Sequence, residues 1–199
     1  MKRVLIFGAG GGIGSEIISL WSHCDKIIPV HKNDINFLVE DDYKKLKDIL
    51  DSQKPDIVVN ACGIFGDNSI DFKSMFEVNV RSNWEILNYY NNNLPDKKVK
   101  LILLGSSSYT GPRVNYMLYA SSKAGLYSLY ESTKELFEDT NIIVGLISPR
   151  RTYTKLISNL VNPNLDNFNN HGCLEPKYVA QKIIDFIENL EESSHIRIE

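Results

Sequence analysis

The fold is decided by residues 2–14, which read KRVLIFGAGGGIG. The apolar run Lys2–Phe7 predicts a buried strand, and the glycines that follow it open a predicted helix at Ile13–Ser22. Glycine is needed where the backbone turns sharply and approaches a pyrophosphate, and the N-terminus of a helix offers free N–H groups to phosphate oxygens. The segment therefore predicts dinucleotide binding. A Walker phosphate loop is disfavoured because no Gly-Lys-Ser/Thr follows. The cofactor-binding residues expected here are Gly8, Gly10, Gly11, Gly12, Ile13 and Gly14.

Beyond this segment, short apolar runs alternate with amphipathic stretches along the whole chain. Strands are predicted at 26–31, 36–39, 56–60, 99–104, 142–147 and 195–198, and further helices at 42–53, 72–91, 119–137 and 176–190. The alternation is typical of an α/β fold, a Rossmann-type doubly wound parallel sheet in one domain spanning 1–199. Only residues 32–35 separate the second predicted strand from the third. Because a parallel crossover needs a dozen or more residues, we expect the helix between strands 2 and 3 to be missing.

Composition and charge exclude several classes of protein. The 199 residues are 43% hydrophobic and 24% charged, which suits one soluble globular domain. No apolar run is long enough to cross a bilayer, and the run Val4–Phe7 is too short for a secretory signal. Three cysteines without a CxxC motif favour a reducing cytoplasm over a disulfide framework or a zinc site. A net charge of −3 gives no basic signature of nucleic-acid binding. We therefore expect a cytoplasmic protein without metal, membrane or nucleic-acid partners.

The spacing of Gly8, Gly12 and Gly14 resembles the short-chain dehydrogenase/reductase family, and further motifs follow in the family's order. They are Asn60-Ala61-Cys62-Gly63, Val78-Asn79-Val80, Gly105-Ser106 and the Tyr-x-x-x-Lys signature Tyr119-Ala120-Ser121-Ser122-Lys123. The first differs from the family's Asn-Asn-Ala-Gly at its second position. The resemblance implies a nicotinamide-dependent oxidoreductase and covers nearly the whole chain.

The same resemblance implies roles for individual residues. It makes Tyr119 the general acid/base, Lys123 a ribose ligand that also lowers the tyrosine pKa, and Ser106 the hydrogen-bond partner of the substrate oxygen. Asn79 would hold a proton-relay water, and Ser107 is an alternative to Ser106. The chemistry agrees, since tyrosine titrates near 10 and a cation four residues along a helix favours its phenolate. Cofactor contacts are further implied for Asn60, Ala61, Gly63, Tyr119, Lys123, Pro149, Thr152 and Thr154.

The end of the second predicted strand bears on the choice of nicotinamide cofactor. NAD-preferring enzymes place an acid there to bind the ribose hydroxyls. Here the strand ends in His31 and Lys32, and no carboxylate occurs before Asp34. Because the two basic residues could hold a 2′-phosphate, we expect NADP(H) to be favoured over NAD(H).

The segment after the sixth predicted strand bears on the substrate. Arg150 stands where the family has glycine, and Arg151 follows it. Arginine pairs suit phosphate or carboxylate capture, so an anionic substrate is predicted, with a local carboxylate or the cofactor pyrophosphate as alternative partners. The stretch 149–152 also resembles reductase domains acting on pentulose phosphates in surface-polysaccharide pathways. Residues 155–172 would form the family's substrate lid.

Two other functions remain open, a catalytically silent NADP(H)-sensing regulator and a sugar-nucleotide epimerase. Epimerases usually carry a further substrate domain, and regulators tend to lose the Tyr/Lys pair. The resemblance implies a homodimer or homotetramer, because helices 72–91 and 119–137 form the dimer bundle in related proteins. Leu126, Tyr127, Leu129 and Tyr130 make the second helix apolar over more than one face, so part of it is expected to meet a partner. The tyrosines of residues 109–130 are predicted to pack in the core and around the site.

Overall fold

The structure is a computed structural model that describes residues 2–21, 26–66, 69–158 and 172–199. One parallel sheet of six strands runs through these residues, in the order β2-β1-β3-β4-β5-β6. Every neighbouring pair is parallel, as the alternating pattern predicts. The strands are β1 (Arg3–Phe7), β2 (Lys26–Val30), β3 (Ile57–Asn60), β4 (Val99–Leu104), β5 (Ile142–Pro149) and β6 (Ser194–Ile198).

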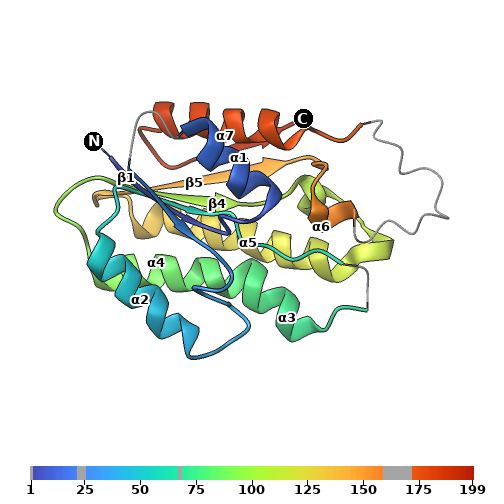
Figure 1. Ribbon diagram of the computed structural model, residues 1–199, viewed down its shortest axis with the longest axis horizontal. Coiled ribbons are helices and arrows are strands. Elements are labelled where there is room, and N and C mark those ends of the chain that lie inside the picture. Colours follow the sequence, from blue (N-terminus) through green and yellow to red (C-terminus); the bar gives the residue numbers. More distant parts are fainter. Residues whose placement is uncertain (1, 22–25, 67–68, 159–171) are drawn as a thin grey trace.

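Helices cover both faces of the sheet (Figure 1). One face carries α1 (Gly12–Trp21) and α7 (Pro176–Asn189), which pack on each other. The other face carries α2 (Asp42–Gln53), α4 (Ser82–Asn92) and α5 (Met117–Leu136). The short elements are α3 (Phe72–Phe76), the π-turn η1 (Glu77–Arg81), the 3₁₀ turns η2 (Ser107–Thr110) and η3 (Val114–Tyr116), and α6 (Lys155–Ser158). Among helices in the described ranges, none is both long and apolar enough to cross a membrane.

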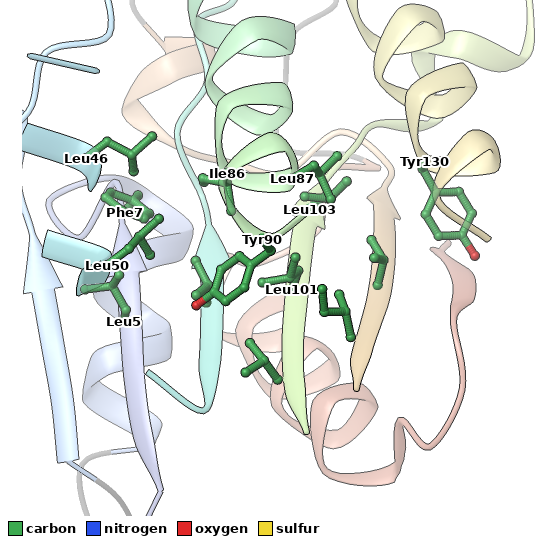
Figure 2. Close-up of a cluster of buried hydrophobic side chains, with 14 of the residues drawn as sticks. Leu5, Phe7, Leu46, Leu50, Ile86, Leu87, Tyr90, Leu101, Leu103 and Tyr130 are labelled. Carbon is green, nitrogen blue, oxygen red and sulfur yellow. The ribbon is translucent and has the colours of Figure 1, made fainter. Parts of the chain in front are cut away.

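The core lies in two layers because successive strand residues point to opposite faces of the sheet. Leu5 and Phe7 of β1 face α2, α4 and α5, and Figure 2 shows them beside Leu50 and Tyr90. Val4 and Ile6 join the other cluster, with α1 and α7. A sheet buried on both faces favours strands that are apolar at nearly every position, which is why the central strands appear in the sequence as largely apolar runs. The exception in β4 is Lys100, whose buried Nζ donates to the Ile187 carbonyl at 2.8 Å.

The strand predicted at 36–39 is wrong. Buried residues do alternate there, at Ile35 and Phe37, and the centres of the Phe37 and Phe7 rings lie 6.0 Å apart. The backbone makes turns instead, because local acceptors take its N–H groups. The Asp42 carboxylate accepts from the Asn36 N–H at 2.7 Å, and the Asn36 side chain accepts from the Leu38 N–H. No helix occupies residues 31–41, as predicted, and α2 alone connects β2 to β3. Because no strand forms at 36–39, β2 is the edge strand and tolerates Pro29.

The long helix predicted at 72–91 is interrupted by a π-turn, η1, over Glu77–Arg81. Single π-turns occur frequently at functional sites, and this one contains Asn79. The chain also changes direction across the sheet between β1 and β3, so that β2 and β3 lie on either side of β1. In open α/β sheets, ligands bind beyond the carboxyl ends of the strands at such a switch point. We therefore expect a ligand to bind at the loops after β1 and β3.

Candidate active site

A cavity of about 740 Å³ lies at the carboxyl ends of the central strands. Loops after four strands line it, together with the start of α5, so residues far apart in the sequence share one space. The lining residues are Gly10–Ile13, Ser15, Ala61–Phe65, Leu104–Ser108, Arg113, Tyr116, Tyr119, Lys123, Pro149–Thr152, Thr154–Leu156 and Gly172.

The glycine-rich loop leaves the bare backbone that a dinucleotide requires. Gly8 has φ +77°, and a Cβ there would lie 2.8 Å from the Ala61 carbonyl carbon. A Cβ on Gly14 would lie 2.3 Å from the Gly8 oxygen, so this glycine allows the helix to begin against the strand. The first turn of α1 starts at Gly12 and lines the cavity, where the N–H groups of a first helical turn lack helical acceptors. These residues fit a pyrophosphate-containing cofactor.

The end of β2 places two basic side chains beside this loop. The ring of His31 is close to Gly10, since a Cβ on Gly10 would lie 3.3 Å from its Nδ1. Lys32 is exposed next to it. The Asp34 carboxylate, the first acid after the strand, accepts the His31 backbone N–H at 2.8 Å. This acid therefore closes a local turn.

Ser106 follows β4 at a position fixed by the glycine before it. A Cβ on Gly105 would lie 2.5 Å from Ser148 Oγ, so only glycine allows the chain to pass here. The Ser106 hydroxyl caps η2 by accepting the Ser108 N–H at 3.2 Å, and it also forms a hydrogen bond with the Tyr119 side chain. The neighbouring candidate, Ser107, lines the same cavity.

Tyr119 lies in the first turn of α5 against an aromatic wall. Its ring packs edge-on against the Phe65 ring, with the ring centres 4.6 Å apart, and its centre lies 6.3 Å from that of the Tyr116 ring. Burial raises the pKa of the Tyr119 phenol, and the hydrogen bond with Ser106 opposes that effect. The phenol is therefore protonated near neutral pH and can donate its proton.

Lys123 is one turn further along α5 and only 4% exposed. Its Nζ donates to the Leu104 carbonyl at 2.9 Å and lies 5.8 Å from the centre of the Tyr119 ring. Burial lowers the pKa of Lys123 to about 8, because desolvation disfavours the charged amine. A lysine this deep in a cavity, with a titration range this close to neutral pH, is typical of a functional site.

Asn79 and Asn60 do not line the cavity, and their side chains hold its floor in place. The Asn79 amide pairs with both backbone groups of Ile64 at 2.9 Å and donates to Ser122 on α5 at 3.0 Å. Asn60 donates to Ser82 and Asn83, each at 3.0 Å. The Asn83 side chain in turn donates to the Asn79 carbonyl at 3.1 Å. A buried polar network thus joins the end of β3 to the π-turn and to the helix that carries Tyr119 and Lys123.

The segment after β5 faces the glycine loop. The Thr154 Cγ2 atom lies 2.6 Å from a Cβ built on Gly12, and Thr152 is buried with its hydroxyl bonded to the Arg150 carbonyl. The Arg150 guanidinium donates to the Gly172 carbonyl at 3.0 Å. Arg151 also lines the cavity. Of the predicted lid, residues 159–171 lie outside the described residues.

Most of the predicted site residues share this one cavity, and a few lie behind or beside it. Gly8, Gly14, Asn60 and Asn79 support it, while His31 and Lys32 lie at its β2 side. Several lining residues were not predicted as site residues, among them Phe65 and Arg113, whereas Tyr116 was among the tyrosines expected in the core and around the site. Arg113 could have been predicted from its position in the chain between Ser106 and Tyr119, because both of these residues are predicted site residues. Within the described residues, no cluster of three or more His, Cys, Asp or Glu side chains could hold a metal ion.

Comparisons with known proteins agree with this geometry. Residues 38–164 match the family model described as short chain dehydrogenase. An uncharacterized oxidoreductase of Bacillus subtilis, YvaG, is 28% identical over 114 residues, 54% of this chain and 43% of that protein. The 17-beta-hydroxysteroid dehydrogenase type 3 of Mus musculus is 24% identical over 168 residues, 78% of this chain and 53% of that protein. The chain thus spans about half the length of the curated relatives it matches.

Solved structures are similar over the whole fold. A 4-hydroxyisoleucine dehydrogenase complexed with NADH has a TM-score of 0.84 at 21% identity, covering 100% of this chain and 97% of that one. The 3-alpha-hydroxysteroid dehydrogenase of Pseudomonas sp. B-0831, also complexed with NADH, has a TM-score of 0.83 at 15% identity, covering 98% of this chain and 94% of that one. At these identities the likeness establishes the fold.

Proposed function

The chain belongs to the short-chain dehydrogenase/reductase family, and we propose on that premise that it is an NAD(P)(H)-dependent oxidoreductase of small alcohols and carbonyl compounds. One observation carries the proposal. Tyr119, Lys123 and Ser106 meet in a cavity that also exposes the bare backbone of the glycine loop. Several roles present together make a stronger case for catalysis than any one motif.

In the reducing direction, the cofactor supplies a hydride to the carbonyl carbon when it is bound. Tyr119 transfers its phenolic proton to the carbonyl oxygen, which becomes the alcohol. Ser106 donates a hydrogen bond to the same oxygen, and charged Lys123 stabilises the phenolate that Tyr119 leaves behind. Asn79 serves in this proposal as the residue that holds a proton-relay water, through its backbone carbonyl. The glycine loop binds the pyrophosphate, while Ala61, Gly63, Pro149, Thr152 and Thr154 flank the rest of the cofactor.

We favour NADP(H) as the cofactor. The His31 ring lies beside Gly10, where the 2′-position of the adenosine ribose would come, and the exposed Lys32 follows His31 in the chain. The nearest following acid, Asp34, already accepts a backbone N–H and is poorly placed to bind ribose hydroxyls. The ratio of the KM values for NADPH and NADH tests this, and a clear preference for NADH would refute it.

The substrate proposed is a small carbonyl compound that carries an anionic group, such as a keto-sugar phosphate of surface-polysaccharide synthesis. Arg150 and Arg151 both line the cavity, and arginine suits phosphate and carboxylate. A screen of NADPH oxidation over keto-sugars, their phosphates and simple ketones tests the substrate class. Faster turnover of neutral ketones than of their phosphates would count against it.

Tyr119→Phe tests the catalytic assignment itself. Loss of the phenolic proton should lower turnover by a factor of about 10² to 10⁴, the usual contribution of general acid catalysis. Binding of NADPH, measured by the quenching of tryptophan fluorescence, should persist. Unchanged turnover in the variant would remove Tyr119 from the mechanism, and tight NADPH binding without turnover in the natural protein would favour a nucleotide-sensing regulator.

We also propose a homodimer or homotetramer in a reducing cytoplasm. Of the four apolar α5 residues considered for this contact, Leu126 and Tyr130 are fully buried in the chain's own core, and Figure 2 shows Tyr130 there. Tyr127 and Leu129 are partly buried against the same core. Support comes instead from Phe72 and Trp84, on α3 and α4, which are 64% and 46% exposed. Cys62 and Cys173 are free thiols, as a reducing compartment requires. Light scattering after size exclusion measures the assembly, and a monomer would refute it.

A further inference from the structure

Arg113 is a cavity residue that the mechanism does not use. It lies between η2 and η3, six residues before Tyr119, and its side chain is half-buried. Its Nη1 donates a hydrogen bond to the Pro112 carbonyl at 3.1 Å, within its own loop. Among the described residues, no carboxylate pairs with it in a salt bridge. A guanidinium with five donors is thus held at the cavity wall by one backbone oxygen.

The charge of the cavity lining is one-sided. Five lining residues are cationic by type, namely Arg113, Lys123, Arg150, Arg151 and Lys155, and the described lining includes no Asp or Glu. The chain as a whole is net acidic, with a formal charge of −3. A cavity lined by one sign of charge concentrates ligands of the opposite sign. Some of these cationic side chains suit the cofactor phosphates, and the others can bind the substrate.

Position separates Arg113 from the other two arginines. Arg150 and Arg151 belong to the segment that ends with Thr154 against Gly12, which is the side of the cavity that binds the cofactor pyrophosphate. Arg113 belongs to the segment that leads through Tyr116 into Tyr119. The Tyr116 N–H donates to the Arg113 carbonyl at 3.2 Å, so the two residues share one turn. Arg113 is therefore on the side of the proton donor.

An aromatic wall connects Arg113 with Tyr119. The Phe65 ring packs edge-on against Tyr119 and Tyr116, with ring centres 4.6 Å and 5.3 Å apart, respectively. The rings line the same cavity as Tyr119 and Arg113, so the carbon skeleton of a substrate meets an apolar surface together with two polar groups, the Tyr119 hydroxyl and the Arg113 guanidinium. Binding sites commonly combine an apolar wall with a small number of placed polar groups in this way.

We propose that Arg113 determines substrate specificity by binding an anionic group, a phosphate monoester or a carboxylate, on the far side of the substrate from its carbonyl. The inference rests on the proposed oxidoreductase function and deepens it. Under this inference Arg113 replaces Arg150 and Arg151 as the residue that binds the substrate anion, and those two arginines take their alternative partner, the cofactor pyrophosphate. A ketone with the anion bound at Arg113 has its carbonyl held at Tyr119, which orients it for reduction.

The test compares Arg113→Gln with the natural protein on matched substrates under saturating NADPH. Dihydroxyacetone phosphate against dihydroxyacetone probes a phosphate monoester, and levulinate against its methyl ester probes a carboxylate. Removing a charged hydrogen-bond partner should lower the ratio of kcat/KM, anionic over neutral, by about 10- to 100-fold. Arg113→Lys should restore part of the ratio. The pair whose ratio collapses identifies the anion.

Two control variants make the result specific. Arg197→Gln removes an exposed arginine on β6 that does not line the cavity, and it should leave the ratio unchanged. Arg150→Gln should raise the dissociation constant of NADPH, measured by fluorescence without substrate, more than it changes the ratio. An unchanged ratio in Arg113→Gln, or a collapse in Arg150→Gln instead, overturns the inference while leaving the proposed function intact. Absence of ketone reduction by the natural protein overturns both.

Discussion

Replacing Lys123 by methionine should make the protein more stable at pH 7 while abolishing its activity. Lys123 is 4% exposed, and burial lowers its pKa from 10.5 to about 8. The charged amine that the proposed mechanism requires is therefore held where solvation is poor. Methionine is a flexible apolar side chain of comparable length, so it fills the same space without the desolvation cost.

The magnitude follows from the pKa and one hydrogen bond. Each pKa unit corresponds to 1.36 kcal/mol, so the displacement of Lys123 from 10.5 to about 8 represents roughly 3 kcal/mol against the folded state. Methionine also loses the bond from Nζ to the Leu104 carbonyl, which contributes about 1 kcal/mol. The net gain is about 2 kcal/mol, or roughly 4–8 °C in Tm for a domain of this size.

The gain should depend on pH with a definite sign. Between pH 8 and 10.5 the unfolded chain keeps the Lys123 proton and the folded protein has lost it, so the natural protein gains stability as pH rises through this range. Below pH 8 both states carry the proton, and the folded state bears the full cost. The advantage of Lys123→Met should therefore be full at pH 7 and close to zero at pH 9.5.

Thermal unfolding of the cofactor-free proteins, followed by circular dichroism at pH 7.0 and 9.5, measures this difference. Lys134→Met is the matched control, since it removes a lysine from the same helix at an exposed position paired with Glu131. Exposed pairs contribute about 0–1 kcal/mol, so this control should gain nothing at either pH. A loss of stability in Lys123→Met at pH 7, or a gain that is equal at both pH values, would refute the reasoning.

Three further substitutions test the parts of the site that surround this lysine. Gly8→Ala should cost more than about 2 kcal/mol in urea unfolding, because φ is +77° and the new Cβ meets rigid backbone at 2.8 Å; a smaller cost would mean that the loop relaxes. Lys32→Ala should raise the KM for NADPH about tenfold and that for NADH little, as a phosphate contact requires; equal effects would exclude a 2′-phosphate site. Asn83→Ala should lower stability by about 1–3 kcal/mol, since it strips partners from Asn60 and from the Asn79 carbonyl; unchanged unfolding would show that water replaces the amide.

The fold could be predicted because its strongest signals are local. The largely apolar strands are explained by a sheet covered on both faces, and the short interval at 32–35 correctly excludes a crossover helix. The strand at 36–39 could not be excluded by periodicity, since Phe37 alternates into the core as a strand residue would. Its backbone is diverted by the side chains of Asn36 and Asp42, whose competition for N–H groups depends on tertiary geometry.

The parts of the site that depend on local sequence could be predicted, and the parts that depend on contacts between distant elements could not. A motif identifies residues within one element, so the glycine loop and the Tyr119/Lys123 pair were visible in the sequence. The lowered pKa of Lys123 was not, because it arises from desolvation, and the burial of the amine depends on how other elements of the fold pack around it. The role of Asn79 differs in the same way. The family motif assigns it to a relay water, and the structure adds that Asn83 already donates to its carbonyl. Any relay water at that oxygen must therefore use its second lone pair. The Asn79 carbonyl thus has a structural hydrogen bond from Asn83 and a proposed role in proton relay. Removing the Asn83 side chain would test whether the two roles depend on each other.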